Sequence, residues 1–115
     1  MAEVNQDFEM FRGDDATLVI SVKNADGSPK NLTGSTAIRW AMSRSPSDDV
    51  ALISKTLGSG VSYIDQIGGV FQVQIAAADT EDLSPRSYYH EAEVTDASNR
   101  KSTVLIGTVA IKPSL

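Results

Sequence analysis

The chain has 115 residues, a formal net charge of −5 and no cysteine. This length fits one domain with one core, so we expect residues 1–115 to form a single domain. The acidic balance argues against a nucleic-acid-binding protein, and the lack of cysteine excludes disulfides and thiolate chemistry. No apolar run is long enough to cross a bilayer, and the N-terminus has no secretory signal pattern, so we expect no membrane partner.

Alternating apolar and polar residues, separated by turn-forming residues, predict eight short strands. In chain order these cover residues 7–11, 16–23, 36–43, 50–57, 61–64, 70–76, 87–95 and 102–112. Their apolar faces predict a core of Leu18, Ile20, Val22, Ile38, Trp40, Phe71, Val73, Ile75, Tyr88, Val94, Leu105 and Val109. Residues 76–83 are expected to form one helical turn, with Asp79 or Thr80 as its cap. Within the last strand the alternation of apolar and polar residues shifts by one position, so Gly107 is the predicted site of a β-bulge.

The strand at residues 87–95 alternates most strictly. One face carries Tyr88, His90, Ala92 and Val94, and the other carries Tyr89, Glu91, Glu93 and Thr95. A Tyr that opens a late strand just after a polar corner is typical of an immunoglobulin-like sandwich, as is a core Trp such as Trp40. The sequence therefore predicts an all-β, immunoglobulin-like antiparallel β-sandwich of about seven to nine strands.

Few residues suggest chemistry. His90 is the sole histidine, and a catalytic or metal-binding role would require partners that cannot be a second His or a Cys, so a packed structural role is favoured. Carboxylates cluster at 14–15, 48–49 and 79–82, but their spacing lacks a calcium-loop pattern and favours solvated turns and helix capping. We expect no catalytic, cofactor-binding or metal-binding residue, and no enzyme activity.

Tyr89 is the best candidate for a contact surface, because it faces away from the core beside Glu91 and Glu93. Trp40 alternates with core residues and is expected to pack inside rather than to stack on a sugar. The tripeptide 12–14 matches an integrin-binding motif, but a match of three residues arises easily by chance. The predicted interface is therefore Tyr89, Glu91 and Glu93.

Several segments together resemble a known family. They are R-G-D leading into L-V-I-S-V at residues 18–22, D-G-S-P-K-N-L-T-G at 26–34, A-I-R-W at 37–40, G-V-F-Q-V at 69–73, A-A-D-T at 77–80 and Y-Y-H-E-A-E-V-T-D at 88–96. This series is similar to the immunoglobulin-like modules of tailed bacteriophages and prophages, above all the N-terminal domain of the baseplate upper protein family. Two departures are residues 84–87, where such modules often carry a Gly, and His90, which replaces an aromatic or aliphatic residue.

The resemblance implies a non-enzymatic structural protein of a phage or prophage particle, in the tail, baseplate or neck. It implies self-association into a homo-oligomer, docking to other tail or baseplate proteins, and a location in the virion, with assembly in the host cytoplasm. The alternative is a cell-surface module that binds a glycan or a protein, which would show an exposed aromatic patch or a dependence on calcium. An enzyme would instead need a pocket with convergent carboxylates.

Overall fold

The computed structural model describes residues 4–47 and 50–114, which are almost entirely β-structure. Within these residues lie nine strands and one short helix. In chain order they are β1 (Val4–Asn5), β2 (Phe8–Phe11), β3 (Ala16–Ser21), β4 (Ala37–Ser43), β5 (Ile53–Leu57), β6 (Gly60–Asp65), β7 (Val70–Ile75), α1 (Ala77–Thr80), β8 (Arg86–Thr95) and β9 (Lys101–Lys112). No helix in this part of the chain is long and apolar enough to cross a membrane.

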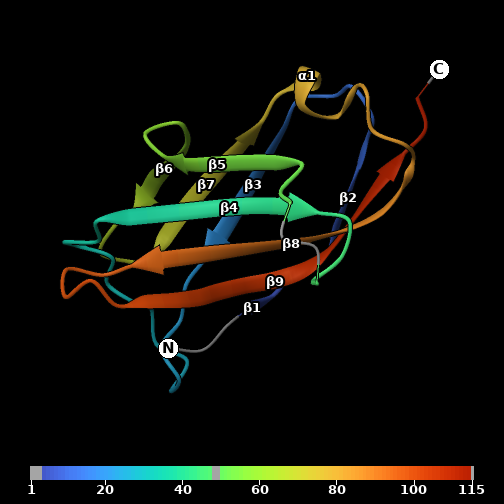
Figure 1. Cartoon of the computed structure of the whole chain (residues 1–115). Helices are drawn as coiled ribbons and strands as arrows, with labels where there is room; N and C mark the ends of the chain where they lie inside the picture. Colours follow the sequence, from blue (N-terminus) through green and yellow to red (C-terminus); the bar gives the residue numbers. More distant parts are fainter. Residues whose placement is uncertain (1–3, 48–49, 115) are drawn as a thin grey trace.

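The described strands form one hydrogen-bonded sheet that folds over on itself (Figure 1). Its order is β1-β9-β8-β4-β5-β6-β7-β3, and β2 also pairs with β9. In Figure 1, β5, β4, β8 and β9 form the front layer, while β6, β7 and β3 run behind them at an angle. The chain crosses between the layers at the tight turn between β5 and β6, where Thr56 lies beside Gly60. The predicted all-β, sandwich-like fold is confirmed.

The sheet is mixed, so the prediction of a wholly antiparallel sandwich is wrong in this respect. β1 and β2 run parallel to β9, and β5 and β6 share a short parallel register. Periodicity in the sequence shows which residues share a face but does not show strand direction. The two-residue strand β1 was also missed, because its strand character depends on pairing with Leu105 and Ile106 of β9.

The core lies between the two layers. All twelve residues of the predicted core are buried, each with an exposed fraction of 6% or less, and Trp40 and Phe71 are completely enclosed. Each large apolar side chain buried in this way contributes roughly 1.5–3 kcal/mol to folding. Leu32, which comes from a connecting loop, is also buried and closes one end of the core.

The register between β8 and β9 shifts once, and not at the predicted position. Ala92 pairs with Leu105, whereas Glu93 pairs with Thr103, so Val104 is the additional residue and is also buried. Gly107 instead stays in register opposite His90. A Cβ atom at Gly107 would lie 2.1 Å from the Gln6 carbonyl oxygen. This position therefore requires glycine because the Gln6 backbone packs against it, and not because the strand bulges there.

The corner before β8 is fixed by a tyrosine. The Tyr88 hydroxyl donates a hydrogen bond of 2.6 Å to the carbonyl oxygen of Ser84, four residues earlier in the chain. The Arg86 guanidinium lies over the Tyr88 ring at 5.4 Å from its centroid. This geometry agrees with the corner predicted from the sequence, and it fixes the point at which β8 enters the front layer.

Replacing Tyr88 with Phe should lower the free energy of unfolding by about 1 kcal/mol, because the Ser84 carbonyl loses its donor in a partly buried corner. Urea denaturation followed by circular dichroism measures this change. Tyr63→Phe is the matched control, since the Tyr63 hydroxyl is buried without a partner among the described residues. The control should be neutral or stabilising, and an equal loss in both variants would contradict a specific role for the corner bond.

Candidate functional site

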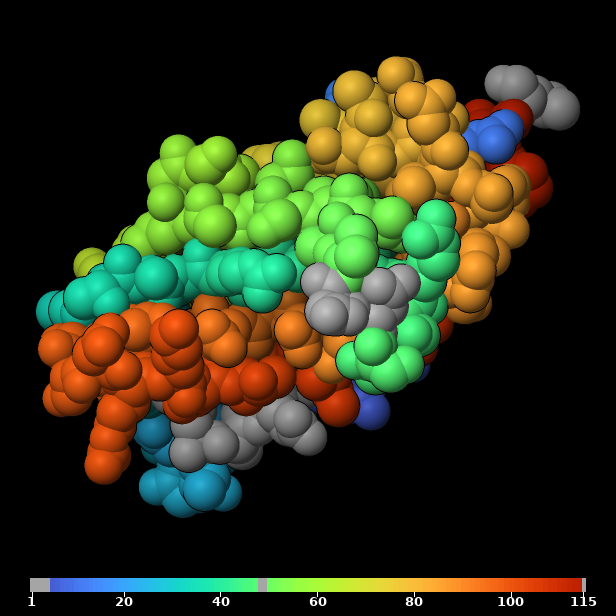
Figure 2. Space-filling view, viewed as in Figure 1, coloured from blue at the N-terminus to red at the C-terminus, as the bar shows by residue number. Residues whose placement is uncertain are grey.

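The three predicted contact residues lie together on the outward face of β8. Tyr89, Glu91 and Glu93 are each half-buried, while the alternate residues of the same strand point into the core. The antiparallel register with β4 places Ser43 opposite Tyr89, Ala41 opposite Glu91 and Arg39 opposite Glu93. This face crosses the front of Figure 2, where β4 is teal and β8 and β9 are orange.

The centre of this face is hollowed. A depression of about 530 Å³ lies over β4 and β8, and its floor is formed by small side chains of β4, Ala41 and Ser43, which are 7% and 8% exposed. Its lining consists of Arg39, Ala41, Ser43, Pro46, Ser47, Ala51, Tyr89 and Glu91. Small residues on β4 beside larger ones on β8 therefore create a recess with an aromatic ring and two opposite charges at its border.

The β4 side of this face was not predicted as part of the site. The alternation in residues 37–43 already placed Arg39, Ala41 and Ser43 opposite Trp40, so that signal was present in the sequence. The register that aligns them with Tyr89 and Glu91 became visible only in the structure. A second depression of about 450 Å³ continues along the same face and includes Arg39, Glu93 and Lys101.

The face is polar and its charges are available for a partner. The Tyr89 hydroxyl donates to Glu91 Oε2 at 3.2 Å. Arg39 is exposed, and the ion pairs found in the described part of the chain are Lys55–Asp79 and Lys112–Glu9, neither of which involves Arg39. Arg39, Tyr89 and Glu91 border the first recess, and Glu93 borders the second. Arg and Tyr are enriched at protein–protein interfaces, so this face is suited to recognising another protein.

His90 has a structural position, as predicted. It is completely buried, and Trp40 Nε1–H donates to its Nδ1 atom at 3.0 Å. Its Nε2 atom lies 2.6 Å from the carbonyl oxygen of Gln6. Both ring nitrogens are therefore occupied, and burial lowers the pKa of His90 below its ordinary value, although Gln6 and the charge of Asp7 oppose this effect.

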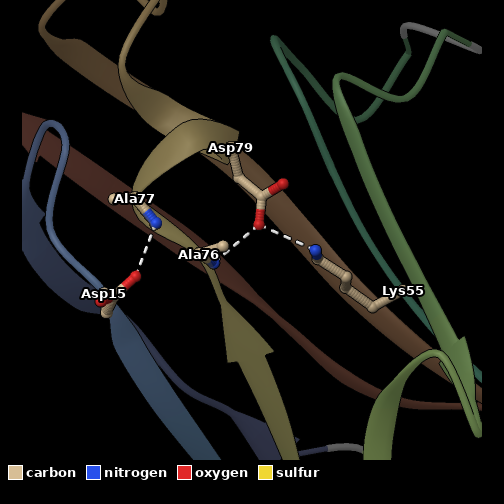
Figure 3. A network of polar contacts seen from close by, with 5 residues as sticks. All are labelled: Asp15, Lys55, Ala76, Ala77 and Asp79. Carbon is tan, nitrogen blue, oxygen red and sulfur yellow. Dashed lines mark hydrogen bonds and ion pairs between the residues drawn. The ribbon is translucent and has the colours of Figure 1, made fainter.

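Two of the carboxylates considered for calcium have structural roles at the corner around α1 (Figure 3). Asp15 Oδ1 accepts a hydrogen bond from the Ala77 amide at 2.8 Å. Asp79 Oδ2 accepts from the Ala76 amide at 2.7 Å and forms an ion pair with Lys55 at 2.8 Å. The predicted helical turn is present as α1, but its N-cap residue is Ala76 and not Asp79 or Thr80; Asp79, the third residue of the helix, instead accepts from the N-cap amide. The pair 48–49 lies outside the described residues.

The tripeptide at residues 12–14 contacts the same corner. The Gly13 amide donates to Thr80 Oγ1 at 2.9 Å, and Thr80 is completely buried. The tripeptide lies in the turn between β2 and β3, and this hydrogen bond holds Gly13 against α1. Within residues 4–47 and 50–114, no three acidic or histidine side chains are grouped in a way that would hold a metal ion.

Comparison of the chain with protein-family models and with curated proteins finds no match.

Asp79→Asn should lower stability by about 0.5–1 kcal/mol, because the α1 terminus and Lys55 both lose a negative partner. Burial raises the pKa of Asp79, but the hydrogen bonds and charge of Lys55 and the Ala76 amide outweigh it, so the pKa is lowered overall. The stability that depends on this carboxylate is therefore present above the ordinary Asp pKa of about 3.9 and is lost as the pH falls below it.

Thermal unfolding at pH 7 and at pH 3 tests this expectation. The variant should be less stable than the unsubstituted protein at pH 7, and the difference should shrink at pH 3. Asp82→Asn, an exposed carboxylate in the same corner, is the control and should change neither value. A difference for Asp79→Asn that does not depend on pH would contradict the electrostatic explanation.

Proposed function

We propose that this chain is a non-enzymatic structural component of a bacteriophage or prophage particle, in its tail, baseplate or neck. It acts by self-association and by docking to neighbouring virion proteins. The recessed outer face of β4 and β8 is the contact surface, with Tyr89, Glu91, Glu93 and Arg39 as its principal side chains. This face carries the proposal, because the Tyr89 ring and the opposite charges of Arg39 and Glu91 border a recess of about 530 Å³ there.

An immunoglobulin-like assignment supports this proposal. In immunoglobulin sandwiches, strands A, B, E and D lie in one sheet and C, F and G in the other. The neighbours β3-β7-β6 and β4-β8-β9 correspond to B-E-D and C-F-G. Trp40 on β4 and the Tyr88 corner on β8 favour this assignment, because immunoglobulin domains carry a core Trp on strand C and a corner Tyr on strand F. His90, two residues after Tyr88, stands where antibody domains carry the second disulfide cysteine.

The residues that resemble phage modules also have structural roles in turns and close backbone contacts. Asp26 Oδ1 accepts from the Ser28 amide at 2.9 Å, and Asn31 Oδ1 accepts from the Thr33 amide at 2.9 Å, so both form tight turns. Gly69, at a φ of 76°, lies so close to the chain that a Cβ atom would be 2.4 Å from the Lys30 carbonyl oxygen. The quoted segments therefore determine how the loops meet the sheet, which supports a shared architecture.

A strand edge offers a second means of association. In the described part of the chain, β3 pairs with β7 alone, and its sequence A-T-L-V-I-S contains no charge and no proline. The Val19 side chain of this strand is 47% exposed, and the Val19 carbonyl accepts a hydrogen bond from the Gln6 side chain at 3.3 Å. Charges and prolines normally protect edge strands from pairing with other chains, so β3 is suited to adding a strand from a neighbouring subunit.

Light scattering coupled to size exclusion, over a range of protein concentrations and with and without calcium, tests self-association. We expect a discrete oligomer whose size does not change with calcium. A double change, Glu91→Lys with Glu93→Lys, should weaken association at least tenfold, which corresponds to about 1.4 kcal/mol. The control, Gln72→Lys with Gln74→Lys, introduces two lysines at the same spacing on β7 in the other layer.

A monomer at all concentrations would exclude self-association and leave only docking to a different virion protein. Loss of association in the β7 control but not in the β8 variant would place the contact on the other layer. Assembly that appears only with calcium would contradict the proposal and favour the alternative, a calcium-dependent cell-surface binding module.

A further inference from the structure

The protonation state of the buried histidine follows from its partners. The indole nitrogen of Trp40 is a donor only, so the Nδ1 atom of His90, 3.0 Å away, must be an acceptor. The ring is therefore neutral and carries its proton on Nε2, which donates to the Gln6 carbonyl oxygen at 2.6 Å. A second proton, on Nδ1, would place two donors opposite each other.

Gln6 belongs to the N-terminal segment, residues 4–11, which crosses from β1 to β2 along the outer edge of β9. The Gln6 amide donates to the Ile106 carbonyl at 2.9 Å, and the Thr108 amide donates to Asp7 Oδ1 at 2.8 Å. Phe8 meets the His90 ring edge-on, with centroids 5.3 Å apart. Gly107 leaves the space in which the histidine ring reaches the Gln6 carbonyl.

The side of the ring away from Trp40 is thus covered by the N-terminal segment. This segment forms backbone pairs with β9 alone within the described residues, and the Gln6 side chain adds one hydrogen bond to the Val19 carbonyl of β3 at 3.3 Å. By contrast β4, which carries Trp40, pairs with strands on both sides. Displacing residues 4–11 therefore breaks one row of backbone hydrogen bonds and uncovers Met10, whereas displacing β4 would break two rows and uncover Ile38, Trp40 and Met42. The N-terminal segment is the part of the surroundings that opens most easily.

We propose that His90 is a pH-sensitive latch whose neutral ring holds the N-terminal segment on β9, and whose protonation releases that segment and uncovers the β9 edge. The uncovered edge then offers unpaired backbone groups to a strand from another chain. This inference does not depend on the proposed function, because it concerns the folded chain by itself.

The direction of the pH effect follows from the environment of the ring. Burial lowers its pKa, while the Gln6 carbonyl and the Asp7 carboxylate oppose that effect from the N-terminal segment. The neighbours on the other elements, Trp40 of β4, Gly107 of β9 and Tyr88 and Ala92 on the same face of β8, carry no charge at neutral pH. In the released state the ring should titrate near its ordinary value of about 6.5.

The latch is therefore complete above about pH 6.5 and weakens as the pH falls. Each pH unit below this value should raise the ratio of released to attached segment about tenfold, until the lower pKa of the attached state is passed. This is a one-proton effect, because the chain has one histidine.

Nuclear magnetic resonance between pH 7.5 and 4.5 is a direct test, since the chain has one histidine and one tryptophan and each gives one set of ring signals. We expect the His90 ring, the Trp40 indole N–H and the amides of residues 6, 12 and 108 to change with one common midpoint below 6.5. Amides of β3 and β7 should remain unchanged over this range. Protonation of His90 without change in residues 4–12, or only with loss of all structure, would overturn the proposal.

Two variants make the test specific. His90→Gln retains an N–H donor for Gln6 but cannot titrate near neutral pH, so the changes in residues 4–12 should disappear. Asp7 is exposed, and Asp7→Asn keeps an oxygen that can accept from the Thr108 amide while it removes the negative charge. It should move the common midpoint about 0.2–0.7 pH units lower. A midpoint for residues 4–12 that stays in place while that of His90 moves would show that the two events are not linked.

Discussion

The register of β4 on β8 determines both faces of the front layer. One set of alternate pairs, which includes Ile38 with Val94, Trp40 with Ala92 and Met42 with His90, points into the core. The intervening pairs place Arg39, Ala41 and Ser43 beside Glu93, Glu91 and Tyr89 on the outside. A slip of one residue would expose Trp40 and bury Arg39, so the core and the contact face are specified by the same hydrogen bonds.

A polar pair at the centre of an apolar core needs a physical reason. Trp40 and His90 are both completely buried, and each satisfies a polar atom of the other. Removing either partner would leave a buried group unpaired, which costs about 1–3 kcal/mol. The pair also fixes an orientation, because the histidine ring can serve Trp40 and Gln6 together in one position only. Apolar packing tolerates small rotations, whereas this arrangement aligns three segments far apart in the chain.

Much of this architecture is encoded locally. Alternation identified eight strands and the whole predicted core, because a strand with one buried face repeats every two residues. The features that sequence could not reveal all depend on long-range contacts. Gly107 was predicted to form a bulge because the apolar alternation shifts around it. The structure shows that a glycine is needed there because the Gln6 carbonyl, over a hundred positions away in the chain, packs against it. The recess is likewise invisible until Ala41 and Ser43 are aligned with Tyr89.

The two ends of the sheet are unlike each other. At one end β3 is uncharged and pairs with β7 alone among the described strands, and the Val19 carbonyl on this strand accepts a hydrogen bond from the Gln6 side chain at 3.3 Å. At the other end β9 is covered by residues 4–11, whose own side chains include Asp7 and Glu9, and Glu9 forms an ion pair with Lys112.

Covering a sheet edge with a parallel segment prevents that edge from pairing with other strands, while the covered strand keeps its own structure. The cover is anchored through His90, a titratable ring that also belongs to the core, so in the proposed latch one buried group links the attachment of the cover to the pH. The two edges therefore differ in what must move before another strand could pair with them: one side-chain hydrogen bond at β3, and a whole segment of backbone hydrogen bonds at β9.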